Sequence, residues 1–278
     1  MKISEHLKTA AEILQASKIS EPRREAASLL AFVLRTDKTF LIAHSDYELS
    51  AEEEKHFQMV LKRRAAREPF QYIVGKQEFY GLDFAVTKDV LIPRPETEMI
   101  VESAFEILNN NARFCEVGIG SGCIAISILH KLQTATAIGL DISEKALKIA
   151  KENAKAHQVL ERLELKISDV FENLSDEKFD LIVSNPPYIS SEEMKTLQPE
   201  VRSFEPLIAL TDAGDGFSII EKIIRGAPKF LNKGGFLLME IGFGQAHKVE
   251  KMFDKKVWRE LEILPDFQKI PRVVKAKK

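Results

Sequence analysis

The chain has 278 residues, 45% of them hydrophobic and 29% charged, and its 40 Lys and Arg against 42 Asp and Glu leave a net charge of −2. This composition is typical of a globular protein with one large and one small domain, and the near-neutral charge excludes broad electrostatic capture of nucleic acid. Two cysteines, no apolar stretch near the roughly 18 residues of a membrane span and no signal-peptide pattern predict a cytoplasmic protein without a metal site or membrane partner.

Residues 1–72 are predicted to be helical, because apolar side chains recur there at helical spacing. Pro22 begins one helix, and Ser50 followed by Glu53 resembles a capping box that starts another. Basic residues near the end of that helix are predicted to form a solvated helix terminus, with docking of a partner as the alternative: Lys62, Arg63, Arg64 and Arg67.

A short hairpin is predicted at residues 79–86, with Gly81 in its turn. After Pro95, helical and strand patterns alternate, which indicates an α/β fold with a mostly parallel sheet and helices on both faces. Predicted strands lie near Phe114 and Ala137, at residues 163–167, 181–184 and 235–241, and near Leu261. The basic residues 275–278 are predicted to form a frayed, solvated tail.

A glycine-rich turn follows the strand at residues 114–117. Gly118, Gly120 and Gly122 stand between that strand and a helix, a geometry that lets backbone N–H groups approach a ligand. Asp141 ends the next strand about 20 residues further on, where a carboxylate can accept hydrogen bonds from both hydroxyls of a ribose. Together these features predict a nucleotide-like ligand at the carboxyl ends of the strands.

The tetrapeptide Asn185-Pro186-Pro187-Tyr188 ends another buried strand. The prolines fix the backbone and remove two N–H donors, so the side-chain carbonyl of Asn185 and the backbone carbonyl of Pro186 remain as acceptors beside an aromatic ring. This arrangement suits a planar group that carries an NH2. Asn-Pro and Pro-Pro are also ordinary turn dipeptides, so a structural turn is the alternative when the motif is taken alone.

Taken together, the glycine turn, Asp141 and the Asn-Pro-Pro-Tyr motif resemble class I S-adenosylmethionine-dependent methyltransferases that methylate amino groups. The segment from Glu68 to Glu98, which includes Pro93-Arg94-Pro95-Glu96-Thr97, resembles the peptide chain release factor glutamine methyltransferases, the PrmC/HemK group. The match extends from about Glu68 to the C-terminus. It implies a Rossmann-like methyltransferase domain at residues 93–278, a hairpin linker at 73–92 and a helical substrate-docking domain at 1–72.

The resemblance implies S-adenosylmethionine as the cofactor and S-adenosylhomocysteine as its product, with no metal. Asp141 is implied to hold the ribose, Ile142 to lie against the adenine and Asp169 to contact adenine N6. The full set of implied cofactor contacts is Glu116, Gly118, Ile119, Gly120, Ser121, Gly122, Asp141, Ile142, Asp169, Val170 and Asn185.

The resemblance also implies a glutamine site in which Asn185, Pro186 and Tyr188 are catalytic. Its implied substrate-binding residues are Arg94, Glu96, Thr97, Asn185, Pro186, Pro187 and Tyr188. Glu240, at the end of a later strand, is implied to support the site. In the last predicted hairpin, Gln268 and Lys269 replace the family's usual glycine-containing turn, which leaves the end of that hairpin undefined.

The implied reaction is methyl transfer to the side-chain amide nitrogen of the glutamine in a Gly-Gly-Gln loop of release factors 1 and 2, by a monomer without direct nucleic-acid contact. A glutamine methyltransferase of a ribosomal protein would share every catalytic motif. An N6-adenine DNA methyltransferase also uses such a motif, but it must flip a base and grip a phosphate backbone. A non-catalytic cofactor-binding module would need no amide acceptor at Asn185.

Overall fold

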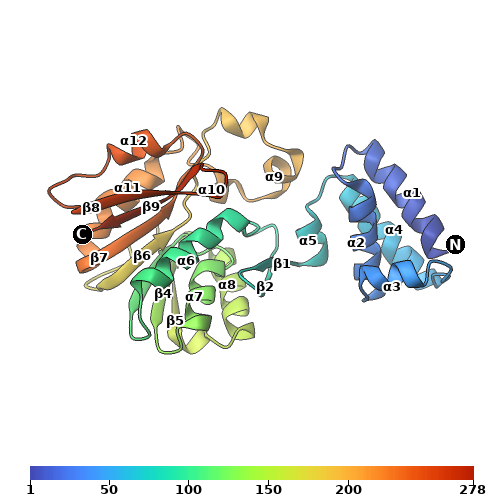
Figure 1. Cartoon of the computed structure of the whole chain (residues 1–278), viewed down its shortest axis with the longest axis horizontal. Coiled ribbons are helices and arrows are strands. Elements are labelled where there is room, and N and C mark those ends of the chain that lie inside the picture. The colour runs from blue at the N-terminus through green and yellow to red at the C-terminus, as the bar shows by residue number, and fades with distance from the viewer. The chain divides into compact units, whose positions relative to one another are not determined.

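The computed structural model describes residues 1–278, and the chain divides into two compact units (Figure 1). We call Met1–Gly75 together with Gln198–Phe204 the helical unit, and Lys76–Leu197 together with Glu205–Lys278 the sheet unit. No helix in either unit combines the length and the apolar character needed to cross a membrane.

The helical unit packs its helices around one apolar core, as the spacing of its apolar residues predicts. The deepest side chains, among them Leu14, Leu29 and Phe57, are completely enclosed. The helices are α1 (Ile3–Ala16), α2 (Pro22–Leu34), α3 (Lys38–Ala43), α4 (Ala51–Ala65), α5 (Phe70–Val74) and α9 (Pro199–Phe204).

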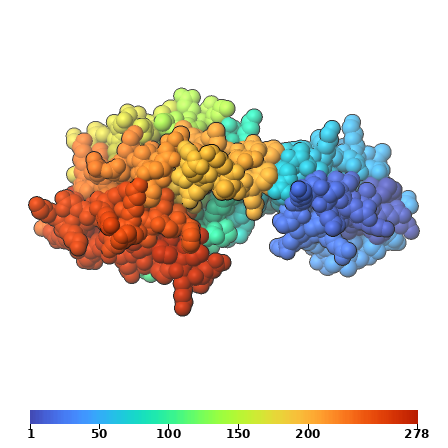
Figure 2. Space-filling view, turned by 90° about the horizontal axis from the view of Figure 1, so that it is seen from above, coloured from blue at the N-terminus to red at the C-terminus, as the bar shows by residue number.

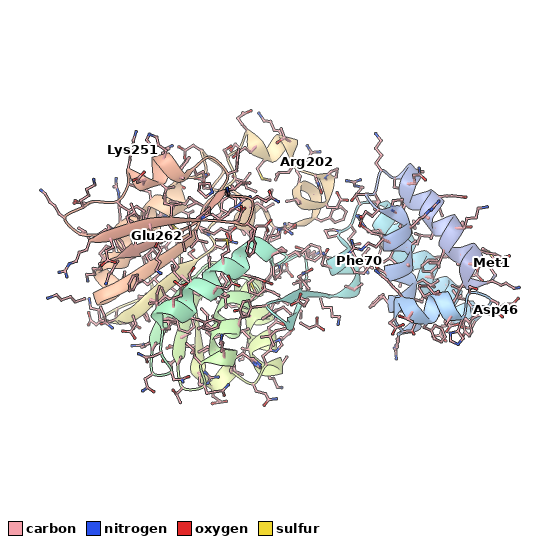
Figure 3. The ribbon with its side chains drawn as sticks, viewed as in Figure 1. Met1, Asp46, Phe70, Arg202, Lys251 and Glu262 are labelled. Carbon is pink, nitrogen blue, oxygen red and sulfur yellow. The ribbon has the colours of Figure 1, made fainter.

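Helix α4 begins with the predicted capping box. The amide of Glu53 donates to the Ser50 hydroxyl at 3.3 Å, and the amide of Ser50 donates to the Glu53 carboxylate at 2.7 Å. The loop before this cap closes over the start of the chain, since the Leu49 amide donates to the carbonyl of Met1. Met1 and Asp46 accordingly lie at the same end of the unit (Figure 3).

The prediction of a solvated basic terminus for α4 is wrong for Arg64, which is only 5% exposed. Its guanidinium donates to the carboxylates of Glu25 and Glu200 and to the carbonyl of Glu68. Arg67 reaches the second oxygen of Glu200 at 2.6 Å. These acidic partners come from distant parts of the sequence, and a buried guanidinium with five N–H donors needs such partners.

A two-stranded hairpin opens the sheet unit, as predicted. Strands β1 (Lys76–Phe79) and β2 (Leu82–Ala85) pair antiparallel through a two-residue turn. Tyr80 and Gly81 both have positive φ angles, 51° and 76°, the conformation of the tight hairpin turns that suit the strand twist. Asn153, from a helix of the same unit, bonds both the N–H and the C=O of the last residue of β2 and so fixes the hairpin.

The rest of the sheet unit alternates strands and helices, which confirms the predicted α/β class. Its strands are β3 (Arg113–Val117), β4 (Thr136–Asp141), β5 (Leu163–Ile167), β6 (Phe179–Ser184), β7 (Leu231–Glu240), β8 (Glu260–Pro265) and β9 (Pro271–Lys277). Its α-helices are α6 (Glu98–Ile107), α7 (Cys123–Lys131), α8 (Glu144–Ala156), α10 (Leu207–Leu210), α11 (Ser218–Phe230) and α12 (Ala246–Glu250), with short 3₁₀ turns at Pro95–Thr97 (η1), Leu160–Arg162 (η2) and Glu193–Thr196 (η3).

The strand order is β5-β4-β3-β6-β7-β9-β8, with every neighbouring pair from β5 to β7 parallel. Helices α6, α7 and α8 cover one face, and α11 and α12 cover the other (Figure 1). From β3 the chain proceeds outward to β4 and β5, then returns to β6 on the other side of β3. The strand order therefore reverses between β3 and β6, and ligands of such sheets bind at this point, beyond the carboxyl ends of the strands.

The prediction of a frayed tail at residues 275–278 is wrong. Strand β9 runs to Lys277 between β7 and β8 and pairs antiparallel with both. Ala276 is completely buried, and the ammonium group of Lys278 donates to the carbonyls of Pro228 and Leu231. The lysines concealed a strand that is buried on both faces of the sheet, with Val273 in one apolar core and Val274 and Ala276 in the other. This C-terminal region, red in Figure 2, lies at one side of the sheet unit.

Candidate active site

A cavity of about 510 Å³ lies at the switch point, where the loops after β3, β4 and β6 converge. Its walls include thirteen of the residues that the sequence singles out: Arg94, Thr97, Glu116, Gly118, Ile119, Gly120, Ser121, Asp141, Ile142, Asp169, Val170, Asn185 and Pro187. Four others, Glu96, Gly122, Pro186 and Tyr188, lie outside the wall. All of these residues belong to the sheet unit.

The glycine turn leaves its backbone open toward the cavity. Gly118 and Gly120 have φ angles of 73° and 54°, and a Cβ atom at either position would meet nothing within 4 Å. A side chain there would strain the backbone and fill space that a ligand could use. Gly122 also has a positive φ angle, 82°, but here a Cβ atom would lie 2.7 Å from the end of the Ile126 side chain. Its backbone conformation and its packing both favour glycine.

Glu116 holds the turn against the helix that follows it. The carboxylate accepts the amide of Ala125, in the first turn of α7, at 2.8 Å. The side chain is almost fully enclosed, and burial raises the pKa of Glu116 well above its usual range. This carboxyl thus couples the end of β3 to α7.

Asp141 joins the loops after β3 and β4. One carboxylate oxygen accepts the amide of Gly120 and the other accepts the amide of Ser143, both at 2.9 Å. Burial raises the pKa of Asp141, while these backbone donors oppose the rise. Each oxygen retains a further lone pair that can accept a hydroxyl from a ligand. Ile142, next in the chain, leaves 52% of its surface exposed at the cavity.

Asp169 and Val170 lie after β5. Asp169 pairs with Lys222 of α11 at 2.9 Å, so one of its oxygens is already occupied. Val170 has a φ angle of 52°, which is a strained conformation for a β-branched residue, and its side chain is buried. These two residues form the part of the cavity wall that comes from the loop after β5.

A chain of hydrogen bonds holds the side chains of the Asn-Pro-Pro-Tyr motif. The Asn185 amide nitrogen donates to Thr97 Oγ1 at 3.0 Å, and Thr97 Oγ1 donates to Glu240 Oε2 at 2.6 Å. The Tyr188 hydroxyl donates to the other oxygen, Glu240 Oε1, at 3.1 Å. Thr97 and Glu240 are each 2% exposed. We call Asn185, Thr97, Glu240 and Tyr188 the amide relay.

The remaining predicted substrate residues take different positions. Pro186 is buried, and Glu96 is exposed. The Tyr188 carbonyl accepts Gln245 Nε2 at 2.9 Å, which fixes the backbone after the prolines. Burial raises the pKa of the Tyr188 hydroxyl, and the nearby Glu240 carboxylate adds to this effect, so the hydroxyl remains a donor.

Part of the cavity wall has no counterpart in the sequence-based prediction. It comprises residues 89–91, 206–209 and 211–213, in loops and the short helix α10. Glu205, which precedes this helix, accepts the Ile92 amide at 3.2 Å and Arg94 at 2.5 Å. Both charged residues stand next to prolines in the sequence, Arg94 between Pro93 and Pro95 and Glu205 before Pro206. Their pairing spans more than a hundred residues, so no local pattern reveals it.

Comparison with known proteins identifies the family. Residues 5–75 match the family model of the PrmC N-terminal domain, and residues 97–201 match that of the methyltransferase small domain. A release factor glutamine methyltransferase of Geobacter sulfurreducens is 42% identical over 256 residues, which is 92% of this chain and 89% of the relative. One of Cereibacter sphaeroides is 41% identical over 277 residues, 100% of this chain and 99% of the relative.

Solved structures show the same fold at much lower identity. A methyltransferase of Pyrococcus furiosus superimposes with a TM-score of 0.54 at 15% identity, covering 81% of this chain and 98% of that one. The predicted methyltransferase fold is thereby confirmed. The full-length similarity to the bacterial relatives goes further: this chain belongs to the release factor glutamine methyltransferase family.

Proposed function

We propose that this protein transfers a methyl group from S-adenosylmethionine to the side-chain amide nitrogen of a glutamine in peptide chain release factors 1 and 2. By resemblance, the target is the glutamine of a Gly-Gly-Gln loop. The observation that carries the proposal is the orientation of Asn185: its amide nitrogen is bound to Thr97, and its Oδ1 has no donor in the protein. A free carbonyl acceptor thus stands in the wall of the cavity that also contains the glycine turn.

The cavity fits S-adenosylmethionine. Two open glycines allow the backbone to approach a ligand, Asp141 has acceptor capacity for ribose hydroxyls, and Ile142 offers an exposed apolar surface to an adenine. When bound, this cofactor supplies a methyl group on a positively charged sulfur, and transfer leaves a neutral thioether. We assign as its contacts Glu116, Gly118, Ile119, Gly120, Ser121, Gly122, Asp141, Ile142, Asp169, Val170 and Asn185, with Glu116 and Gly122 acting through the shape of the turn. The absence of a metal remains a prediction.

The substrate needs orientation more than it needs a base. A carboxamide nitrogen is a weak nucleophile, because its lone pair is delocalised into the carbonyl. Asn185 Oδ1 and the carbonyl of Pro186 would each accept one N–H of the glutamine, which holds the nitrogen in line with the methyl group and raises its electron density. The new N–C bond would form as the S–C bond breaks, and the surplus proton on the nitrogen would pass to solvent when the product leaves the pocket. Positioning and fixed dipoles would then provide most of the rate.

We propose that the other motif residues shape the glutamine pocket. Pro187 and Tyr188 would exclude water from the amide, and Arg94, held by Glu205, would border the entrance with Glu96. In this proposal Thr97 acts through Asn185, since its side chain is almost fully buried and accepts the Asn185 amide.

We further propose that residues 1–72 dock the release factor and that the protein acts as a monomer without direct contact to nucleic acid. A glutamine in a folded protein has to be presented by contacts outside the cavity, and remote contacts of this kind contribute to positioning at the reacting centre. The proposed linker, residues 73–92, contains the hairpin that begins the sheet unit.

Mass spectrometry tests the function. Purified release factors, ribosomal proteins and adenine-containing DNA are each incubated with the protein and labelled S-adenosylmethionine. The proposal expects one methyl group on the Gly-Gly-Gln glutamine of the release factors. Label in DNA but not in the release factors would favour the adenine alternative, and label only in a ribosomal protein would favour the other glutamine methyltransferase.

A second comparison tests docking. A short Gly-Gly-Gln peptide should be methylated with a kcat/KM at least about 10²-fold below that of the whole factor, if remote contacts provide positioning. Equal values for peptide and protein would remove the docking role from the helical unit. The test uses the intact chain, because Glu200 lies in sequence between the two segments of the sheet unit yet pairs with Arg64 and Arg67. Deleting residues 1–75 would leave Glu200 without these partners.

A further inference from the structure

We infer that Thr97 and Glu240 are positioning residues that set which way the Asn185 amide faces, so that its carbonyl oxygen and never its NH2 meets the substrate nitrogen. The inference rests on the proposed function. It concerns two almost fully buried side chains that we expect to act on the substrate through Asn185 and Tyr188.

The direction of the amide relay follows from counting hydrogens. Glu240 as a carboxylate has acceptors only, and both of its oxygens receive a hydroxyl. The single hydrogen of Thr97 is therefore committed to Glu240. Its oxygen can only accept from Asn185, and of the two ends of the amide only the NH2 can donate.

The opposite amide orientation would defeat the reaction. With the amide reversed, Asn185 Oδ1 would face Thr97 with no hydrogen between them, and two N–H groups would confront the N–H groups of the incoming glutamine. Each mismatched pair would leave polar groups without a hydrogen bond, which is unfavourable where water is excluded. The relay thus makes the productive orientation the favoured one before any substrate binds.

The Glu240 carboxylate contacts both ends of the Asn-Pro-Pro-Tyr motif, one directly and one through Thr97. Glu240 is the last residue of β7, next to β6, whose final residue Ser184 precedes Asn185. Through Thr97 it holds Asn185, and directly it holds the ring of Tyr188. A shift of this carboxylate would therefore move the Asn185 acceptor and the Tyr188 ring together.

The charge environment of Glu240 favours a functional role over a purely stabilising one. The side chain is enclosed, burial raises its pKa, and its direct partners are two hydroxyls. Arg272 lies near enough to favour the carboxylate, but its guanidinium is paired with Asp266 at 3.2 Å. A buried carboxylate with only neutral direct partners is costly, and an apolar residue of similar volume would often be as stable.

The test uses variants of the intact protein with release factor and labelled S-adenosylmethionine. Thr97→Val removes the hydroxyl but keeps the shape, and Thr97→Ser restores it. We expect Thr97→Val to lower kcat by roughly 10- to 10²-fold, as expected for a misplaced reacting group, with the KM for the release factor and the Kd for the cofactor within about threefold of wild type. Thr97→Ser should recover most of kcat. Ser127→Ala is the control, because it removes a buried hydroxyl that has no partner.

A double-variant cycle separates positioning from general damage. If Thr97 acts through Asn185, adding Thr97→Val to Asn185→Ala should cause little further loss of kcat. Independent, multiplicative losses would overturn the inference, and so would a folded Thr97→Val protein with wild-type kcat or with cofactor affinity lost in proportion to kcat.

Glu240→Gln covers the case in which Thr97→Val does not fold. Its amide can present either end to Thr97, so the direction of the relay is no longer determined and kcat should fall by about tenfold at unchanged cofactor Kd. Unchanged kcat would overturn the inference. A wild-type protein that methylates no release factor would instead contradict the proposed function, so the two failures are distinguishable.

Discussion

The two units each enclose a charged group, and they satisfy it in different ways. In the helical unit, Arg64 is surrounded by carboxylates and a carbonyl that belong to the same unit. In the sheet unit, Glu240 accepts two hydroxyls, and one of them, Thr97, accepts the Asn185 amide nitrogen. The network ends at the carbonyl oxygen of Asn185, which has no partner in the protein. We call the first network closed, because all partners of Arg64 lie within the protein, and the second open, because it ends at an acceptor without a partner.

This difference indicates what each network contributes. A closed network changes stability when it is broken, because its members are left buried and unpaired. In the proposed function, breaking the open network changes turnover, because its last member would accept a hydrogen bond from the reacting amide. Variants of the two networks should therefore separate stability from activity.

The largest expected effect is on the closed network. Arg64→Met should lower the free energy of unfolding by about 3 kcal/mol, because Glu25 loses its buried guanidinium partner and Glu200 keeps only Arg67. Urea unfolding followed by far-UV circular dichroism measures the change. Arg24→Met is the matched control: its pair with Glu21 is exposed and should cost at most about 1 kcal/mol. Equal losses for the two variants would contradict the distinction between a closed buried network and a surface pair.

The next effect is on the open network. Asn185→Ala should reduce turnover by roughly 10²-fold or more, about 2.7 kcal/mol, while cofactor affinity is largely kept. Single-turnover methylation of a release factor measures it. Asn232→Ala is the control, because Asn232 also donates a hydrogen bond from its amide nitrogen, in its case to Asp180, but lies at the opposite end of β7 from Glu240. Near wild-type turnover in Asn185→Ala would rule out the amide-acceptor mechanism.

A smaller effect is expected on cofactor binding. Asp141→Ala should weaken S-adenosylmethionine binding by about 1–3 kcal/mol, since the ribose hydroxyls of the cofactor and the amides of Gly120 and Ser143 would lose an acceptor. Calorimetry on the folded variant provides the measurement. Asp37→Ala removes a carboxylate that caps α3 in the helical unit and should leave the affinity unchanged. If Asp141→Ala binds as tightly as wild type, Asp141 is not a cofactor contact.

The smallest effect concerns a helix cap in each unit. Ser50→Ala and Ser143→Ala both remove an N-cap hydroxyl and should each lower stability by about 1 kcal/mol. Only Ser143 lines the cavity, so only Ser143→Ala should also change cofactor affinity. Thermal unfolding and calorimetry compare the two. A loss of cofactor affinity in Ser50→Ala would show that the units are coupled more tightly than their separate cores suggest.

The sequence alone determined the parts of this protein that depend on neighbours along the chain. Ser50 and Glu53 predicted the start of α4, and Gly81 predicted the hairpin turn. The alternating pattern after Pro95 predicted the sheet, because caps, turns and periodicity are local properties. The glycine turn and Asp141 were also predictable as neighbours, since the carboxyl ends of adjacent parallel strands meet at one edge. Composition misled where charge was the only local signal, at Arg64 and at residues 275–278.

Only the tertiary structure decided how the polar groups are paired. Thr97 lies 88 residues from Asn185 and 143 from Glu240 in the sequence. Nothing local indicates that this threonine is buried or that its one hydrogen is committed to a carboxylate. The direction of a hydrogen-bond chain depends on which donors and acceptors meet after burial excludes water, and folding brings η1, β6 and β7 together at that point. Local sequence motifs thus predict which residue types the site contains, whereas the packing of the fold determines the orientation of the Asn185 amide.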